Sequence, residues 1–432
     1  MAGLLTLYET LIRAGQPALE MLLRARARRG KEDRLRMGER KGRASIKRPI
    51  GKIVWVHAAS VGEAQSALIL INAMDNAAPD THIVVTTGTV TSATLMERRL
   101  PANAFHQYVP LDHPAWVKSF LDHWRPDLAL WMESELWPNM LRALKRRDIP
   151  AVLVNARLSE NSFRNWSLAG NAARKIVRTF DIILAQTKED AQRYEALGAT
   201  NVIAGDNLKY GAAPLPYDEL SLSALSLTVD GRAVWVYAST HEGEEELSCR
   251  VHATLKEKIP SLLTVIVPRH PERREDIAKA CFKHSLKFRL RSQNVALPAP
   301  DDDIYIADTL GELGLFYKLC PVAMIGRSFS ADGGGGHNPI EAAQLGCAVL
   351  TGPNNQNQRQ IYDDMADGGA VIEVKTEGEL IGVLDDLLGD AALLKAQQKK
   401  SAAFAANKSH VADAVLSHIL PYLETEQTSH AA

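Results

Sequence analysis

The chain has 432 residues, more than one hydrophobic core usually supports, so its length favours two or three domains. Its composition, 46% hydrophobic and 23% charged, excludes a disordered or collagen-like protein, and the lack of any apolar run of about 18 residues argues against a full membrane span. The formal net charge is -1, and the four widely spaced cysteines form no CxxC pair or disulfide ladder, which indicates a reducing cytosol.

The first 48 residues combine an apolar helical pattern with a basic stretch. Apolar residues recur at helical spacing at Leu4, Leu7, Tyr8, Leu11 and Ile12. Residues 24–48 then hold twelve Lys or Arg against three acids, a formal charge of +9. We interpret residues 1–48 as a membrane-associating helix that lies in the interface, followed by a basic segment on anionic headgroups. A basic helical hairpin packed on the body of the protein is the alternative. No nucleic acid is expected, because no aromatic residues interleave with the cations.

Residues 49–210 alternate short apolar runs with segments of helical length. The runs predict buried parallel strands at Ile53–His57, Ile83–Thr86, Leu128–Trp131, Ala151–Val154 and Ile182–Ala185. The segments between them predict helices at Gly62–Ala73, Ser92–Arg99, Pro114–His123 and Glu189–Leu197. This βαβ alternation is typical of a doubly wound α/β domain.

A second series of the same kind occupies residues 231–432, which we assign to a second domain ending in C-terminal helices. Its predicted strands are Ala233–Ala238, Leu263–Val267, Ile304–Ala307, Val322–Ile325 and Ala348–Leu350. Residues 211–230 hold two prolines and no clear strand pattern, so we interpret them as the linker. Val54–Glu63 and Val234–Glu244 also resemble each other, which favours two Rossmann-like domains facing across a cleft, although chance similarity of strand starts is the alternative.

Polar residues follow the first predicted strand in the sequence HAASVGE, residues 57–63. Ser60 and Glu63 have the spacing of a capping box at a helix start, which is a purely structural interpretation. A carboxylate at the carboxyl end of a strand is also what a glycosyltransferase needs as general base, to take the proton of an attacking hydroxyl. The spacing alone leaves both interpretations open.

Two more carboxylates, Glu133 and Glu135, follow the strand at Leu128–Trp131. They either cap the next helix or contact a sugar and support the base. Arg157 and Lys209 also follow strand-like runs, and cations at strand ends suit phosphate oxygens. We expect these four side chains at the same edge of the first domain.

In the second half, Arg269 follows a strand and is a good phosphate ligand, because a guanidinium binds two oxygens at once. A segment with four glycines, ending at Gly336, leads through Asn338 into a helix that carries Glu341 on its first turn. Glycines let backbone N–H groups approach a phosphate, and the acid suits ribose hydroxyls. The alternative is a flexible structural turn.

Another helix start after a strand is predicted at Gly311, Glu312 and Leu313, where further free N–H groups could meet the nucleotide. The run Asp301–Asp303 precedes a strand, so we interpret it as a solvated turn and not as a metal motif. No metal site is predicted, because the sequence has no cluster with metal-ligand spacing, and no GxSxG elbow indicates a hydrolase.

Six motifs occur in an order that resembles the 3-deoxy-D-manno-octulosonic acid (Kdo) transferases of lipopolysaccharide assembly. They are HAASVGE, ESELWPN, NARLSE, GDNLKY, VPRHPER and GGGGHNPIEAA followed by GP. The resemblance covers most of the chain. It implies a GT-B fold, the co-substrate CMP-Kdo as donor with no cofactor, and a lipid A precursor as acceptor at the cytoplasmic face of the bacterial inner membrane, with the protein peripheral or N-terminally anchored.

The resemblance also implies a role for each candidate residue. Glu63 is then the general base, with Ser60 beside it, and Arg269 and Gly311–Leu313 hold the CMP phosphate. The nucleotide residues are Gly336, Asn338 and Glu341, and the acceptor or Kdo side has Glu133 or Glu135, Arg157 and Lys209. Two rival functions stay open, another GT-B enzyme that uses a UDP-sugar and a non-catalytic, membrane-associated nucleotide-binding scaffold.

Overall fold

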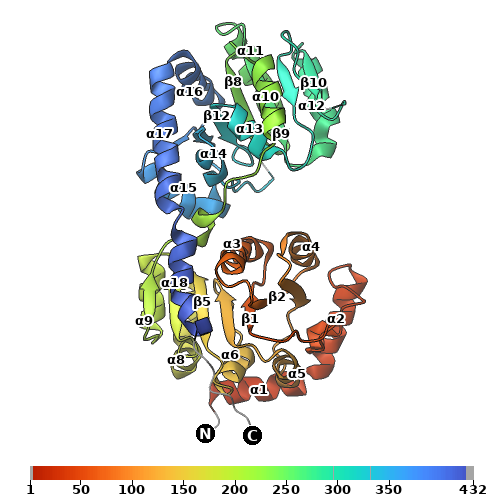
Figure 1. Cartoon of the computed structure of the whole chain (residues 1–432), viewed down its shortest axis with the longest axis vertical. Helices are drawn as coiled ribbons and strands as arrows, with labels where there is room; N and C mark the ends of the chain where they lie inside the picture. The colour runs from red at the N-terminus through yellow and green to blue at the C-terminus, as the bar shows by residue number, and fades with distance from the viewer. Residues whose placement is uncertain (1–2, 295, 331, 425–432) are drawn as a thin grey trace. The chain divides into compact units, whose positions relative to one another are not determined.

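The computed structural model describes residues 3–294, 296–330 and 332–424 and divides into two compact units (Figure 1). Unit 1 combines the chain up to Ala212 with the residues from Ser409 on, and unit 2 is Ala213–Lys408. The described residues of each unit form a seven-stranded sheet with helices in the connections, and their strand pairings are all parallel. The predicted doubly wound α/β architecture is therefore confirmed for both units.

The sheet of unit 1 has the strand order β3-β2-β1-β4-β5-β6-β7, so the order reverses between β1 and β4. Its strands are β1 (Ile53–His57), β2 (His82–Thr87), β3 (Ala104–Tyr108), β4 (Leu128–Met132), β5 (Ala151–Ala156), β6 (Ile182–Ala185) and β7 (Val202–Ala204). Its main helices are α3 (Val61–Ala77), α4 (Val90–Arg99), α5 (Pro114–Trp124), α6 (Pro138–Lys145), α7 (Glu160–Leu168), α8 (Asn171–Val177) and α9 (Lys188–Ala196). Every residue of β1 and β4 is buried, as expected for inner strands covered by helices on both faces.

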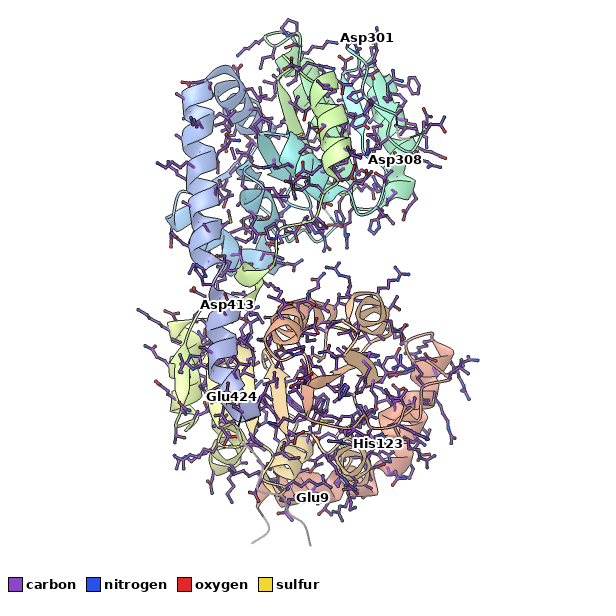
Figure 2. The ribbon with its side chains drawn as sticks, viewed as in Figure 1. Glu9, His123, Asp301, Asp308, Asp413 and Glu424 are labelled. Carbon is purple, nitrogen blue, oxygen red and sulfur yellow. The ribbon has the colours of Figure 1, made fainter. Side chains whose placement is uncertain are left out.

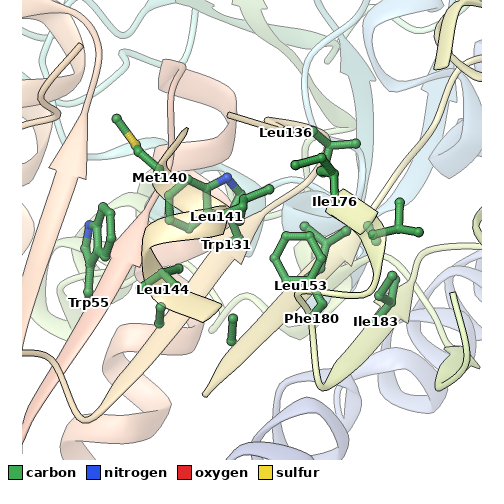
Figure 3. Close-up of a cluster of buried hydrophobic side chains, with 14 of the residues drawn as sticks. Trp55, Trp131, Leu136, Met140, Leu141, Leu144, Leu153, Ile176, Phe180 and Ile183 are labelled. Carbon is green, nitrogen blue, oxygen red and sulfur yellow. The ribbon is translucent and has the colours of Figure 1, made fainter. Parts of the chain in front are cut away.

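Aromatic side chains of the inner strands form the centre of unit 1's core (Figure 3). The rings of Trp55 on β1 and Trp131 on β4 meet edge to face with centroids 4.9 Å apart, and Phe120 of α5 packs 4.6 Å from Trp55. The Trp55 indole N–H donates to the Thr86 hydroxyl at 2.8 Å, so its buried polar atom is satisfied. This packing holds β1 and β4 together just before the loops that carry the candidate site.

The sheet of unit 2 has the order β10-β11-β9-β8-β12-β13-β14, which reverses between β8 and β12. Its strands are β8 (Val234–Thr240), β9 (Leu263–Pro268), β10 (Phe288–Leu290), β11 (Ile304–Ile306), β12 (Val322–Ile325), β13 (Ala348–Thr351) and β14 (Val371–Glu373). Its helices are α10 (Glu219–Thr228), α11 (Glu244–Lys256), α12 (Arg274–Lys283), α13 (Leu313–Leu319), α14 (Ile340–Gln344), α15 (Arg359–Asp367), α16 (Glu377–Gly389) and α17 (Ala391–Lys408). Helix α10 lies inside the predicted linker and packs on α13, so most of residues 211–230 belong to unit 2.

The N-terminal segment, which we predicted as a separate membrane-associating part, packs on unit 1. It forms α1 (Leu4–Ala14), α2 (Gln16–Arg28) and the short turn η1 (Glu39–Lys41), and α1 contacts α5. The buried Arg40 pairs with the buried Glu32 at 3.1 Å and donates to the Val109 carbonyl at 2.8 Å. The described part of the N-terminal segment thus packs on the body of unit 1, and within the described residues no helix has the length and apolarity needed to cross a bilayer.

The last described helix, α18 (Val411–Glu424), belongs to unit 1 and not, as we predicted, to the second domain. It packs on α3 and on the short helix η2 (Leu208–Gly211). The residues that it buries are Val411, Ala412, Leu416, Ile419 and Leu423. Its apolar stripe needs a partner, but the sequence pattern does not say which unit supplies it.

This assignment predicts the effect of an α18 mutation. Ile419→Ala opens a cavity beside α3 and η2 and is expected to cost about 2–4 kcal/mol of unfolding free energy. Hydrogen exchange of the full chain, read by mass spectrometry, is expected to quicken in α3 and η2. Ser417→Ala, an exposed change on the same helix, is the control. Faster exchange confined to unit 2 would contradict the assignment.

Candidate active site

The candidate site of unit 1 begins at the first turn of α3, after β1. The Ser60 hydroxyl accepts the Glu63 N–H at 3.2 Å, so the predicted helix cap is present. The Glu63 carboxylate does not close the capping box onto Ser60; its Oε2 accepts the N–H of Ala59 at 2.6 Å. The carboxylate therefore folds back over the loop that follows β1, at the edge where β1 and β4 end side by side.

Glu63 has the electrostatics of a proton acceptor. Its side chain is buried, and this burial, reinforced by the negative charges of Glu133 and Glu135, raises its pKa to about 7. At neutral pH, protonated and ionised forms are then both well populated. Such a group can take a proton from a neutral hydroxyl and release it again.

Glu133, after β4, is held by backbone contacts. Its φ is 55°, in the left-handed region that only a few non-glycine residues occupy. Its N–H donates to the Val154 carbonyl at 3.0 Å, and its own carbonyl accepts the Tyr194 hydroxyl at 3.4 Å. Burial raises the Glu133 pKa, while the charges of Lys209 and Arg157 lower it. The predicted acids and cations of unit 1 are therefore close enough to interact.

Two asparagines that we did not predict position Lys209. Asn155, at the end of β5, also has a left-handed φ of 55°, and its side-chain oxygen accepts the N–H of Leu208 at 2.9 Å. The Asn207 side chain accepts the N–H of Lys209 at 3.1 Å. The only sequence signal for these two positions was an Asn after each strand-like run. Asparagine suits such positions because it tolerates the left-handed region and its side chain bonds to nearby backbone groups.

In unit 2, a buried carboxylate organises the glycine-rich segment. Glu244, at the start of α11 after β8, accepts the N–H groups of four described residues, which come from two loops. They are His241 (2.9 Å), Arg327 (2.7 Å), Ser328 (2.9 Å) and Phe329 (2.8 Å). We did not predict this role, although Glu244 matches Glu63 in the repeated segment. The loops after β8 and β12, neighbouring strands at the reversal point, are thereby fixed to each other.

Packing explains the glycines at 335 and 336. Both have positive φ, and a Cβ at Gly335 would lie 2.1 Å from the Asn357 side chain, while one at Gly336 would lie 2.9 Å from Tyr362. The next residue is also held, since the Tyr362 hydroxyl donates to the His337 carbonyl at 2.7 Å. In this conformation of the loop, glycine is therefore required at both positions.

Asn338 and Glu341 lie at the start of α14, as predicted. The Asn338 side-chain oxygen accepts the N–H of Ile340 at 3.1 Å, and its amide donates to Glu341 Oε1 at 3.4 Å. The amide of Asn338 and the carboxylate of Glu341 therefore lie side by side, an arrangement that can bind neighbouring hydroxyl groups.

A cationic group surrounds this loop. Burial, together with the charges of His241, Arg269 and Arg327, lowers the His337 pKa to about 4, so the ring is neutral at pH 7. His241 bridges the group, with one ring nitrogen 3.0 Å from Asp332 and the other 3.0 Å from His337. The predicted phosphate ligand Arg269 is thus brought to the glycine-rich segment, and the surplus positive charge favours an anion.

The helix start predicted at residues 311–313 is present, and the side chain of Glu312 has a partner there that we did not predict. Helix α13 begins at Leu313 after Gly311, whose φ is 86°, but the Glu312 carboxylate pairs with the buried Arg291 at 2.8 Å. It also accepts the Thr309 hydroxyl. The Glu312 side chain therefore stabilises its own loop.

The solvated turn predicted at Asp301–Asp303 is wrong for two of the three acids. Asp302 is buried and pairs with Arg289 at 2.7 Å, and the buried Asp303 accepts the N–H of Lys287 at 2.9 Å. Local sequence did not reveal these partners. Among the residues that the structure describes, no group of three or more His, Cys, Asp or Glu side chains is placed to hold a metal ion.

The chain forms two doubly wound units, and in each unit polar residues gather where the strand order reverses. This arrangement defines the class of the protein, a GT-B type enzyme. UDP-GlcNAc 2-epimerase from Neisseria meningitidis has this fold: its solved structure aligns with a TM-score of 0.56 and 14% identity, over 86% of this chain and 100% of that one. A likeness at this identity concerns the fold alone.

The sequence comparisons are more specific. Residues 33–212 match the family described as 3-deoxy-D-manno-octulosonic-acid transferase (kdotransferase). The transferase of that name from Rickettsia typhi is 36% identical over 86% of this chain and 80% of its own length. A probable mitochondrial 3-deoxy-D-manno-octulosonic acid transferase from Arabidopsis thaliana is also 36% identical, over 91% of this chain and 90% of its own length. The chain belongs to the Kdo transferase family, so it is a glycosyltransferase that transfers Kdo.

The role of Glu244 is testable by an isosteric change. Glu244→Gln replaces an oxygen acceptor by an NH₂ group that faces N–H donors, so we expect a loss of about 2–3 kcal/mol of stability and faster hydrogen exchange at Gly326–Ser330. Glu246→Gln, in the same helical turn, is the control. Equal melting temperatures for the two variants would contradict this role.

Proposed function

We propose that this Kdo transferase takes the sugar from CMP-Kdo and transfers it to a hydroxyl of a lipid A precursor with inversion, as a step of lipopolysaccharide core synthesis. The observation that carries the proposal is Glu63, a buried carboxylate with a pKa of about 7 at the strand-order reversal of unit 1. The choice of donor and acceptor is supported by the ordered motifs shared with the family.

The proposed reaction is a single displacement. The acceptor hydroxyl oxygen forms a bond to the anomeric carbon of Kdo while its proton passes to Glu63. The bond from that carbon to the phosphate oxygen breaks, and its electron pair leaves with CMP. Glu63 then returns the proton to solvent, so no covalent intermediate or cofactor is needed.

The other residues have proposed roles in binding. In unit 2, Arg269 binds the CMP phosphate, and Asn338 and Glu341 bind ribose hydroxyls beside the backbone of Gly336. Gly311 and Leu313 supply backbone N–H groups to the nucleotide, whereas Glu312 supports that loop through Arg291. In unit 1, Arg157 and Lys209 bind the Kdo carboxylate or acceptor phosphate, while Glu133 and Glu135 tune the base.

We also propose that the protein acts peripherally at the cytoplasmic face of the inner membrane. Three leucines on one side of α1, Leu4, Leu7 and Leu11, are each at least half exposed. Of the twelve cations in residues 24–48, all of them described, seven are exposed: Arg24, Arg28, Arg29, Lys31, Arg34, Arg43 and Lys47. The others are partly or fully buried, so fewer cations than the sequence predicted are available to anionic headgroups.

A transfer assay tests the proposed base and donor. With CMP-Kdo and a tetraacyl lipid A precursor, the native chain is expected to add Kdo mass increments to the lipid. Glu63→Gln should bind CMP-Kdo normally but turn over roughly 10²–10⁴ times more slowly, because only proton transfer is lost. Glu160→Gln, the same change at an exposed glutamate of unit 1 that lies outside the candidate site, is the matched control. Near-native turnover of Glu63→Gln refutes the base, and transfer from UDP-sugars alone refutes the donor.

The pH dependence of kcat/KM tests how the charges near Glu63 affect its pKa. Because Glu63 must be ionised to accept a proton, kcat/KM is expected to rise with pH and reach half its maximum near pH 7. Glu133→Gln removes a negative charge that raises the Glu63 pKa, so this midpoint should move to lower pH. The exposed Glu160→Gln should leave it in place. A midpoint that moves upward, or equally in both variants, contradicts the argument.

A further inference from the structure

A pocket of about 600 Å³ opens on unit 1 between α1, α5 and α6. Glu9, labelled in Figure 2, lines it together with Arg13 of α1, Lys118 of α5 and Arg146, which directly follows α6. It lies outside the set of residues assigned above to Kdo transfer. Its volume is several times that of a phosphate ion, so a larger ligand is needed to fill it.

Two buried polar side chains that line the pocket have unsatisfied atoms. His113 is 3% exposed, and neither of its ring nitrogens has a hydrogen-bond partner among the described residues. Asn139 is 4% exposed; its amide donates to the Asp112 carbonyl at 2.7 Å, but its Oδ1 lacks a partner within the described chain. Buried polar atoms are nearly always satisfied in native proteins, so these atoms need a polar partner, either an ordered water or a ligand group.

The charges around the pocket are unbalanced. Glu9 is shared by Arg13 at 2.7 Å, Arg142 at 3.0 Å and Arg146 at 3.4 Å, so a single carboxylate faces three guanidinium groups. On the other side, Lys118 and Arg147 both lie 2.5 Å from Asp122. Asp112, which accepts the N–H groups of Asn139 and Met140, is a third carboxylate nearby, so three carboxylates face five cations. The surplus of cations, mostly arginine, favours a phosphate group.

The pocket walls also contain apolar carbon. Pro114, Ala115, Val117 and Ala143 line it beside the cations. A ligand that matches both the cationic and the apolar part of the pocket lining carries a phosphate next to a short aliphatic or glycerol portion. On the pocket side, α1 presents Glu9 and Arg13, and α2 begins with Gln16. Leu4, Leu7 and Leu11 lie on the opposite flank of α1 and are exposed. The same helix therefore offers a phosphate site on one flank and an apolar stripe on the other.

We propose that this pocket binds the phosphate and glycerol headgroup of an anionic phospholipid, so that unit 1 recognises a particular membrane lipid. The inference rests on the proposed membrane association and adds a defined headgroup site to it. Arg13 and Arg146 contact the phosphate oxygens, and His113 and Asn139 bond the glycerol oxygens. The leucine stripe then contributes apolar contact that is independent of the headgroup.

The first test uses dihexanoyl phosphatidylglycerol below its micelle concentration, titrated into the full chain by calorimetry. Saturable binding is expected, and Arg146→Glu should weaken it about tenfold or more by reversing a charge at the phosphate. Arg164→Glu is the matched control. Arg164, like Arg146, is an exposed arginine of unit 1 that pairs with a glutamate, in this case Glu160 of the same helix. Absence of saturable binding, or equal loss in both variants, overturns the proposal.

The second test separates the headgroup site from the apolar stripe and from the acceptor. Leu7→Ser should reduce binding to phosphatidylglycerol-containing vesicles and leave binding of the short-chain lipid unchanged, with the exposed Leu168→Ser as control. If a deacylated, phosphorylated lipid A headgroup binds in an Arg146-dependent manner while phosphatidylglycerol does not, the pocket belongs to the acceptor and the proposal is wrong. These readouts need no turnover, so failure of the proposed Kdo reaction leaves them interpretable.

Discussion

Each unit depends on a buried carboxylate at the first turn of the helix that follows its reversal-point strand. In unit 2, Glu244 accepts N–H groups from the loops after β8 and β12 and so serves as a structural link. In unit 1, the corresponding Glu63 is bonded at one oxygen by Ala59 and faces two other acids. The same residue type in the same place is therefore structural in one unit and suited to proton transfer in the other, because the number of donors around it differs.

The basic N-terminal segment shows how one set of charges is divided between folding and the surface. Arg40 is buried with Glu32, and Arg36 is bound to Glu39 at 3.0 Å. Buried charges need such partners, whereas the exposed arginines are solvated at the surface. Net charge counted along the sequence consequently overstates the charge that this segment exposes on the surface. The pocket under α1 adds cations from α5 and α6, which the charge of the N-terminal segment does not include.

The strands that sequence reasoning missed share one property, since all four lie at the edges of the sheets. They are β3, β7, β10 and β14. Their residues are largely half-buried, so they lack the continuous apolar run that identified the inner strands. The inner strands were predicted to within a few residues, because burial on both faces demands apolar side chains throughout. The prediction of a solvated turn failed at Asp302 and Asp303 for the opposite reason. Their polar sequence indicated exposure, but cations from distant parts of the chain pair with them and allow their burial.

The sequence by itself determined the two α/β series, the Ser60 cap, the family and the candidate residues at strand ends, since these depend on local pattern and on ordered motifs. Only the tertiary structure decided that α18 returns to unit 1, that Glu244 ties two loops together, and that Glu312 is held by Arg291. It also decided the raised pKa of Glu63. Each of these depends on burial and on partners far away in the chain, and the electrostatic environment of a side chain exists only once those partners are brought around it.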